Sequence, residues 1–358
     1  MTEKKLPIAE PLISAYPEVG QVFSIIDYDD PKSLKWMFSN FVQLYVHHKR
    51  RMTYVESLPL HYTAGHKVPT LFHYCISKNI IEKKYENLLD FIVESINDGY
   101  YVSMMLDRFY LSNSEDYESV HKYHNTLFYG YDMERRIFYG QDNQGKYINK
   151  EYSFEDVEFA YYQGYKCEDC GNNAAGSIML AERVTNVLYQ FNLKYLINEL
   201  EFYLNSYGSE ICENYNMVHH YRAQLPRVEV RYFNLGVYDY FKEMMQNPEN
   251  VGGIDVIACY VFYEHKAFME KRVEFLKEKG YLSAETQLCE EAAVIEENAQ
   301  IFLNAVLKYL EIPQDEIAKK VAALLNVLEL LDEVKALEIG FVQNLLEELK
   351  GNIADGSV

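Results

Sequence analysis

Apolar and polar positions change their spacing several times within the first 160 residues, which predicts a mixture of short strands and helices. Residues 31–48 follow a pair of Asp residues suited to a helix N-cap, and their apolar positions recur at helical spacing, so we expect a helix. Residues 83–98 show the same spacing and are followed by Gly99, a typical helix stop. The runs 68–77 and 100–111 are rich in apolar and aromatic residues and predict strands.

Two further strand-like runs predict a β-hairpin over residues 124–142. The first run begins at His124 and the second ends at Asp142, with a polar turn near Asp132–Arg135. A short turn makes the two strands neighbours, so we expect the His and the Asp to lie together at one end of the hairpin.

The pattern becomes mostly helical after a Gly- and Asn-rich break near residue 165. Long helices are predicted over 181–208, 257–280, 285–310 and 315–350, the last with apolar positions at three- and four-residue steps. We therefore expect an α+β protein: residues 1–165 form a domain with an antiparallel sheet, and residues 166–358 form a helical domain.

Composition and charge narrow the classes of partner. The formal net charge of −20 argues against nucleic acids and anionic membranes as main partners. The N-terminus lacks a signal-peptide core, and no apolar run approaches the length of a membrane span, so we expect a cytoplasmic protein. Six scattered Cys residues fit reduced thiols, and the lone pair Cys167 and Cys170 is too small a set for a structural zinc site, so we expect no metal.

His124 and Asp142 are the candidate catalytic pair. An Asp that accepts from one imidazole nitrogen fixes the tautomer and leaves the other nitrogen free as a general base or acid. The alternative is a His that bonds to neighbouring backbone or hydroxyl groups. His121, expected in the preceding loop, is a rival candidate for the base.

Several motifs resemble the butirosin biosynthesis protein H family, which is related to papain-like bacteriocin-processing peptidases. The similar segments are "INDGYYVSMMLDRFYL", "HNTLFYGYD" and "YGQD" in the first half, and "NLGVYDYF" and "FYEHKAFMEKRVEFL" in the second. The resemblance is strongest over residues 85–142 and covers most of the chain. It implies a papain-like N-terminal domain followed by a helical domain.

The resemblance also implies a reaction: transfer of an acyl group from a carrier-protein thioester to an amine, in thiotemplated natural-product pathways. The family uses a Cys at the start of the first helix, with a polar residue such as Gln a few positions earlier. Here Gln21 is present, but the matching window "GQVFSIIDYDDPKSLKW" contains no Cys.

Three interpretations of the missing thiol remain open. Ser33 replaces it near the start of the predicted helix, Cys75 reaches His124 from a strand, or the covalent step is lost. In the third case His124 would act as a base for direct aminolysis, or the protein would only bind its substrate. We favour the third.

Acidic and basic residues supply candidate binding groups. Asp27, Asp30 and the strand-end residue Asp107 are candidates for binding an amine, although helix capping, loop capping or an ion pair with Arg108 would also explain them. The run "HHKRRM" contains Arg50 and Arg51, which we expect to dock an acyl or peptidyl carrier protein.

The sequence therefore predicts an acyltransferase or amide synthase with a small amine acceptor, and no cofactor beyond a phosphopantetheine arm that presents the substrate. The alternative is a papain-fold binding or scaffold protein without catalysis. A peptidase is disfavoured because the thiol is missing and a helical domain follows. A homodimer is left open.

Overall fold

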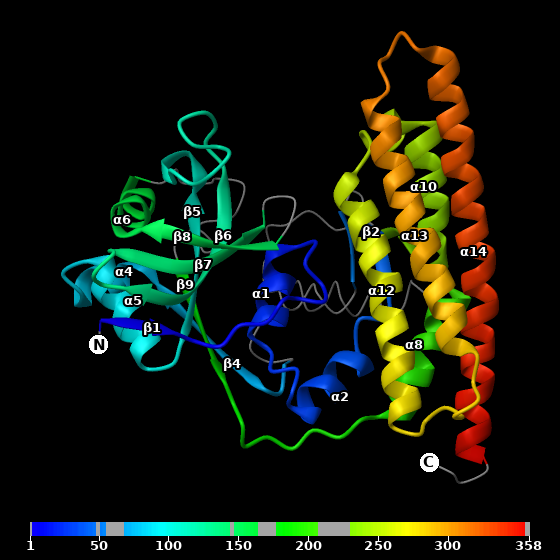
Figure 1. The fold of residues 1–358 in the computed structure, drawn as a ribbon, viewed down its shortest axis with the longest axis horizontal. Helices are drawn as coiled ribbons and strands as arrows, with labels where there is room; N and C mark the ends of the chain where they lie inside the picture. The colour runs from blue at the N-terminus through cyan, green and yellow to red at the C-terminus, as the bar shows by residue number, and fades with distance from the viewer. Residues whose placement is uncertain are drawn as a thin grey trace. The chain divides into compact units, whose positions relative to one another are not determined.

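The computed structural model describes residues 2–47, 51–54, 68–143, 147–163, 177–206 and 230–354. The chain forms two compact units, one of residues 1–34 and 60–189 and the other of residues 35–59 and 190–358 (Figure 1). The sequence predicts one boundary near residue 165, whereas the chain passes between the units within α2 (Pro31–Ser39), near residue 60 and after Tyr189.

A seven-stranded sheet forms the centre of the first unit. Its path is β4 (Leu71–Ser77), β9 (Ser177–Arg183), β5 (Tyr101–Asp107), β6 (Tyr123–Asp132), β7 (Ile137–Asn143) and β8 (Tyr147–Ser153), and β1 (Glu3–Lys5) pairs with β6 beside β5. Every neighbouring pair is antiparallel. The predicted antiparallel sheet is therefore confirmed, and the turn between β6 and β7 lies where the sequence predicts it.

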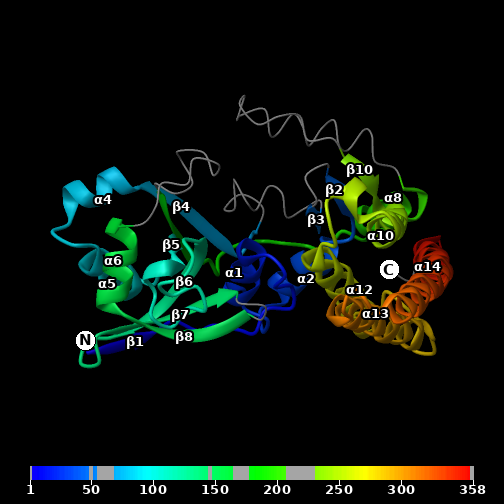
Figure 2. The ribbon, with the colours of Figure 1, turned by 90° about the horizontal axis from the view of Figure 1, so that it is seen from above.

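Helices cover both faces of this sheet. The helices α4 (Lys78–Lys84), α5 (Leu88–Asn97) and α6 (Phe154–Gln163) share a buried core with one face, built around Val102, Met104 and Phe128 (Figure 2). Successive strand residues face opposite sides, so Ser103 faces away from this core. It contacts α1 (Pro17–Ile25) through Gln21, so α1 lies on the other face.

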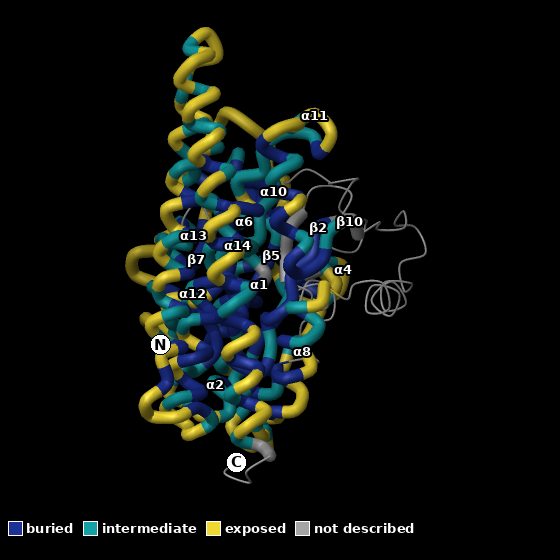
Figure 3. The backbone as a smooth tube through the Cα atoms, turned by 90° about the vertical axis from the view of Figure 1, so that its right-hand side faces the viewer, coloured by how far each residue is buried: buried dark blue, intermediate teal, exposed yellow. Residues whose placement is uncertain are grey.

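The second unit is mostly helical, which confirms the helical C-terminal region. Its described helices include α8 (Leu193–Asn205), α10 (Val237–Gln246), α11 (Pro248–Val251), α12 (Val256–Glu278), α13 (Leu288–Glu311) and α14 (Ile317–Ala354). The end of the α13–α14 hairpin carries mostly exposed residues, whereas along the middle of both helices buried, intermediate and exposed residues alternate (Figure 3). A three-stranded sheet of β10 (Val230–Phe233), β2 (Leu44–His47) and β3 (Arg51–Tyr54) completes the unit.

Three helix predictions were wrong in part. The helix predicted over 83–98 begins only at Leu88, because Asn87 is extended and accepts from the Asp90 N–H as N-cap. The helix predicted over 31–48 ends at Ser39, because Phe41 adopts a φ of 61°, and the chain then forms β2. The helix predicted over 181–208 begins only at Leu193, after Asn192 accepts from the Tyr195 N–H as N-cap. Residues 181–183 instead complete β9, where pairing with β4 on one side outweighs local helix preference.

Candidate functional site

Three adjacent strands bring the candidate catalytic residues to one end of the sheet. His124 lies near the start of β6, opposite Leu106 near the end of β5. Asp142 lies near the end of β7, the strand on the other side of β6. The hairpin turn thus places the two residues together, as the sequence predicts.

The His124 ring contacts the Asp142 carboxylate directly. Nδ1 of His124 lies 2.6 Å from Oδ1 of Asp142; the imidazole side chain is 19% exposed and the carboxylate 1%. Burial alone would raise the pKa of Asp142, but His124 and Arg108 outweigh it and hold this pKa below its usual range. Asp142 is therefore an ionised partner at neutral pH, and any acid–base role of the ring falls to Nε2.

Arg108 completes this cluster and was not assigned to it from the sequence. It directly follows β5, is 3% exposed, and donates from Nη2 and Nε to the two oxygens of Asp142 at 2.7 and 3.1 Å. An Arg next to the end of a buried strand is the signal that could have revealed it, because a buried guanidinium requires an anionic or polar partner.

A second His–Asp pair lies beside the first. Nδ1 of His121 is 2.7 Å from Oδ2 of Asp107, and the His121 ring stacks on Phe109 at 4.1 Å. The other oxygen of Asp107 accepts from the backbone N–H groups of Phe109 and Lys122. Asp107 is fully buried and engaged by these groups, so it resembles the loop-capping alternative more than an open site for an amine.

Gln21 lies on the other face of the sheet. Its Nε2 donates to the Asn125 carbonyl oxygen at 3.3 Å, and its Oε1 lies 2.6 Å from the Ser103 hydroxyl. Because neighbouring residues of a strand face opposite sides, Asn125 faces α1 while His124 shares the face of Phe128, which is covered by α5 and α6. The structure therefore does not bring Gln21 and His124 together.

Ser33 and the acidic cluster lie near the opposite end of the sheet. The Ser33 hydroxyl is fully buried and 3.2 Å from that of Thr70, the residue before β4. The start of β4 pairs with the end of β9. The end of β9 in turn pairs with the start of β5 at Tyr101. His124 pairs five residues further along β5, which corresponds to about 17 Å along the strand.

Asp27 and Asp30 belong to the same region and cap local turns. Asp27 accepts from the Asp29 N–H, and Asp30 accepts from the Lys32 N–H, both at 3.0 Å. Lys32 also forms an ion pair with Asp30 at 3.5 Å. These contacts match the capping alternative, and they leave the two carboxylates far from the His124 pair.

Cys75, the described thiol in the same unit as His124, also lies away from it. Cys75 is exposed on β4, three strands from β6, a separation of about 14 Å across the sheet. Cys259 and Cys289 belong to α12 and α13 of the other unit. Cys167 and Cys170 lie outside the described residues, as does Arg50, and the side chain of Arg51 is likewise not described.

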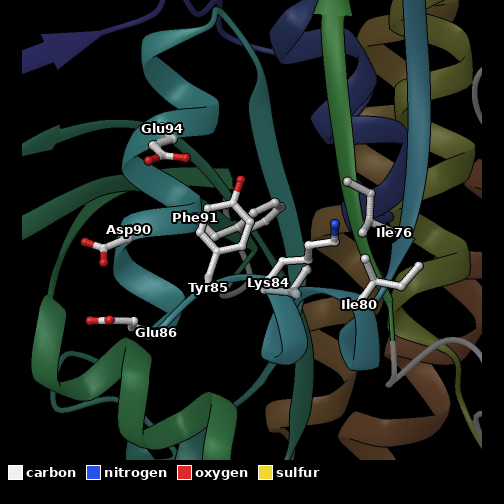
Figure 4. Close-up of a pocket in the computed structure, with 9 residues that line it drawn as sticks. Ile76, Ile80, Lys84, Tyr85, Glu86, Asp90, Phe91 and Glu94 are labelled. Carbon is white, nitrogen blue, oxygen red and sulfur yellow. The ribbon is translucent and has the colours of Figure 1, made fainter.

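A surface groove of about 610 Å³ lies along α4 and α5 (Figure 4). Glu86, Asp90 and Glu94 line one side of it, and in Figure 4 the carboxylates of Glu86 and Asp90 point away from Ile76 and Ile80. No residue of the His124 cluster lines this groove. It does not combine with the cluster into one site.

No protein-family model and no curated protein matches the chain. Among the residues that the structure describes, no three or more His, Cys, Asp or Glu side chains gather into a set able to hold a metal ion. None of the described helices combines the length and the apolar character needed to cross a bilayer.

Proposed function

We propose that the protein is an acyltransferase of a thiotemplated pathway, which transfers an acyl group from a carrier-protein thioester to a small amine without a covalent acyl-enzyme. His124 Nε2 accepts a proton from the amine as its nitrogen attacks the thioester carbonyl carbon. The C–N bond forms, the C–S bond breaks, and the proton returns to the thiolate that leaves. The products are an amide and the free carrier thiol.

The observation that carries this proposal is the His124–Asp142 pair. The ring is partly exposed while its Nδ1 is held by a buried, ionised carboxylate, which is the arrangement that a general base requires. The described residues place neither Ser33 nor Cys75 within reach of this ring, which favours direct aminolysis over a covalent route. The acyl-transfer reaction itself is proposed because the short motifs around the hairpin resemble those of the family.

The resemblance carries further parts of this proposal. The first unit is assigned a papain-like ancestry within the butirosin biosynthesis protein H family. The acyl donor would be an acyl or peptidyl carrier protein in the cytoplasm, with its phosphopantetheine arm presenting the thioester. We infer no resident cofactor, because proton transfer by His124 balances the reaction.

A binding or scaffold protein for carriers or a partner enzyme is the second candidate. One observation favours it: Gln21, the residue matched to the family's catalytic Gln, lies on the opposite face of the sheet from His124. An oxyanion donor on that face could not serve a thioester held at His124. In this case the His124 cluster would only stabilise the strand ends.

Intact-protein mass spectrometry and product analysis with a loaded carrier and an amine separate the two candidates. Wild type is expected to form amide with no acyl adduct, and His124→Ala should lower the rate by about 10²–10⁴-fold. Cys75→Ser is the matched control and should keep full activity, because Cys75 is three strands away. Full activity of His124→Ala, or an adduct on wild type that Cys75→Ser abolishes, would refute the mechanism.

A further inference from the structure

Arg108 directly follows β5 and is almost fully buried, which is unusual for an Arg side chain. Its guanidinium donates to both oxygens of Asp142, and Oδ1 of Asp142 lies 2.7 Å from Arg108 Nη2 and 2.6 Å from His124 Nδ1. A planar guanidinium matches the two oxygens of a carboxylate, whereas a Lys ammonium would act as a single point charge. The fork therefore fixes the orientation of the carboxylate that meets the ring.

We propose that Arg108 is a positioning residue of the His124 site: it holds Asp142 in place and its charge makes the His124 ring release a proton more readily. This inference deepens the proposed acyl transfer and rests on it for its catalytic meaning. A lone buried carboxylate would strongly favour the protonated imidazolium. Arg108 offsets much of that negative charge, and its fork keeps the carboxylate oriented toward the ring.

Other charged groups lie near the His124–Asp142 pair and contribute to its electrostatic environment. Asp116, in the loop after β5, lies 3.6 Å from Arg108 Nη1, and Lys122 lies 3.7 Å from Asp116. On β8, burial lowers the pKa of Lys150, and Asp142 opposes this shift. Among the described residues, Arg108, Lys150 and Tyr152 interact with Asp142, and Glu115, Asp116 and Lys122 interact with Arg108, Lys150 or one another.

The role can be tested by NMR titration of the His124 imidazole in the full chain, with His124→Gln used to assign the resonance. Arg108→Gln removes the charge and should raise the midpoint of the titration by about one pH unit. Arg108→Lys keeps the charge but loses the fork, so the midpoint should stay within a few tenths of a unit while the acyl-transfer rate falls about tenfold. Arg136→Gln, at an exposed Arg–Glu pair on the same hairpin, is the matched control and should change neither.

A second variant tests the same electrostatic role in case Arg108→Gln does not fold. Asp116→Asn leaves the fork on Asp142 intact but removes a carboxylate that partly neutralises Arg108, so it should shift the midpoint downward by on the order of 0.3 unit. Opposite signs for Arg108→Gln and Asp116→Asn are the signature of the proposed electrostatic role. A purely structural Arg108 would instead lower thermal stability and leave the midpoint unchanged.

The outcomes separate this inference from the proposed function. An unmoved midpoint in folded Arg108→Gln, or in Asp116→Asn if the first variant does not fold, overturns the inference even when wild type transfers acyl groups. Midpoints that shift as described in a protein that forms no amide would support the electrostatic role of Arg108 and refute the acyltransferase proposal alone.

Discussion

Substitution of the buried Lys266 by Met should strongly destabilise the helical unit. Lys266 donates to Glu338 at 2.6 Å and to the Tyr203 hydroxyl at 3.0 Å, and the Tyr238 hydroxyl donates to the other oxygen of Glu338 at 2.6 Å. The side chains of the ion pair are 0% and 1% exposed. This network joins α8, α10, α12 and α14 at the centre of the unit.

The magnitude follows from the charge left behind. Two buried ions that attract each other offset their desolvation, but a single buried ion has no such compensation, so Lys266→Met should cost about 3–5 kcal/mol. The double variant Lys266→Met/Glu338→Gln removes both charges and leaves an amide oxygen to accept from Tyr238. It should recover more than half of the loss.

The single tryptophan of the chain provides the assay. Trp36 belongs to the helical unit and is 4% exposed, so its fluorescence reports the unfolding of that unit even if the two units unfold separately. With a slope of about 2 kcal/mol/M, the urea midpoint of Lys266→Met should fall by about 2 M. Lys271→Met, at an exposed Lys–Glu pair on the same helix, is the control and should shift by less than about 0.5 M.

Two results would refute this reasoning. If Lys266→Met stays within about 1 kcal/mol of wild type, the buried charge is relieved by water or by rearrangement. If the double variant is no more stable than the single one, the loss comes from packing rather than from the uncompensated carboxylate.

Three further predictions concern other parts of the chain. Burial lowers the pKa of His265 well below its usual range, so the helical unit should lose stability as pH falls below about 6.5, by up to about 1.4 kcal/mol per unit, and His265→Gln should flatten this slope in Trp36 fluorescence. A Cβ at Gly130 would lie 2.6 Å from the Lys4 carbonyl oxygen, so Gly130→Ala should detach β1 and speed amide exchange there; unchanged exchange would contradict the close approach. Reversal of Arg50 and Arg51 to Glu should weaken carrier binding at least tenfold by titration calorimetry, and equal affinity would remove their docking role.

The local pattern of apolar and polar residues was enough to predict those elements whose intrinsic secondary-structure preference agrees with their position in the fold. The period of α5 and the stop at Gly99, with a φ of 95°, could be read from the sequence, as could the hairpin of β6 and β7. It failed at β2, where a run of apolar residues suits a helix or a strand equally and pairing with β3 and β10 decides. No local signal indicates such long-range pairing.

The site shows the same division between near and distant contacts. His124 and Asp142 could be paired from the sequence because a short turn makes their strands neighbours. The approach of Arg108 to Asp142 depends on a third strand, and the burial of Ser33 against Thr70 depends on where α2 meets the sheet. A linear window therefore placed Ser33 and Gln21 in a site that their tertiary contacts do not form.

The alternation of side chains along β6 decides which groups can take part in a reaction at His124. His124 and Asn125 are neighbours in sequence, yet alternation sends one to the face of α5 and α6 and the other to Gln21 on α1. A register shift of one residue would reverse both, but the regular β5–β6 ladder and the buried Phe128 fix the register. Any reaction at His124 must therefore draw on the strand-end residues Asp142 and Arg108 and on its own face of the sheet, and it must proceed without the α1 amide that the resemblance would assign to it.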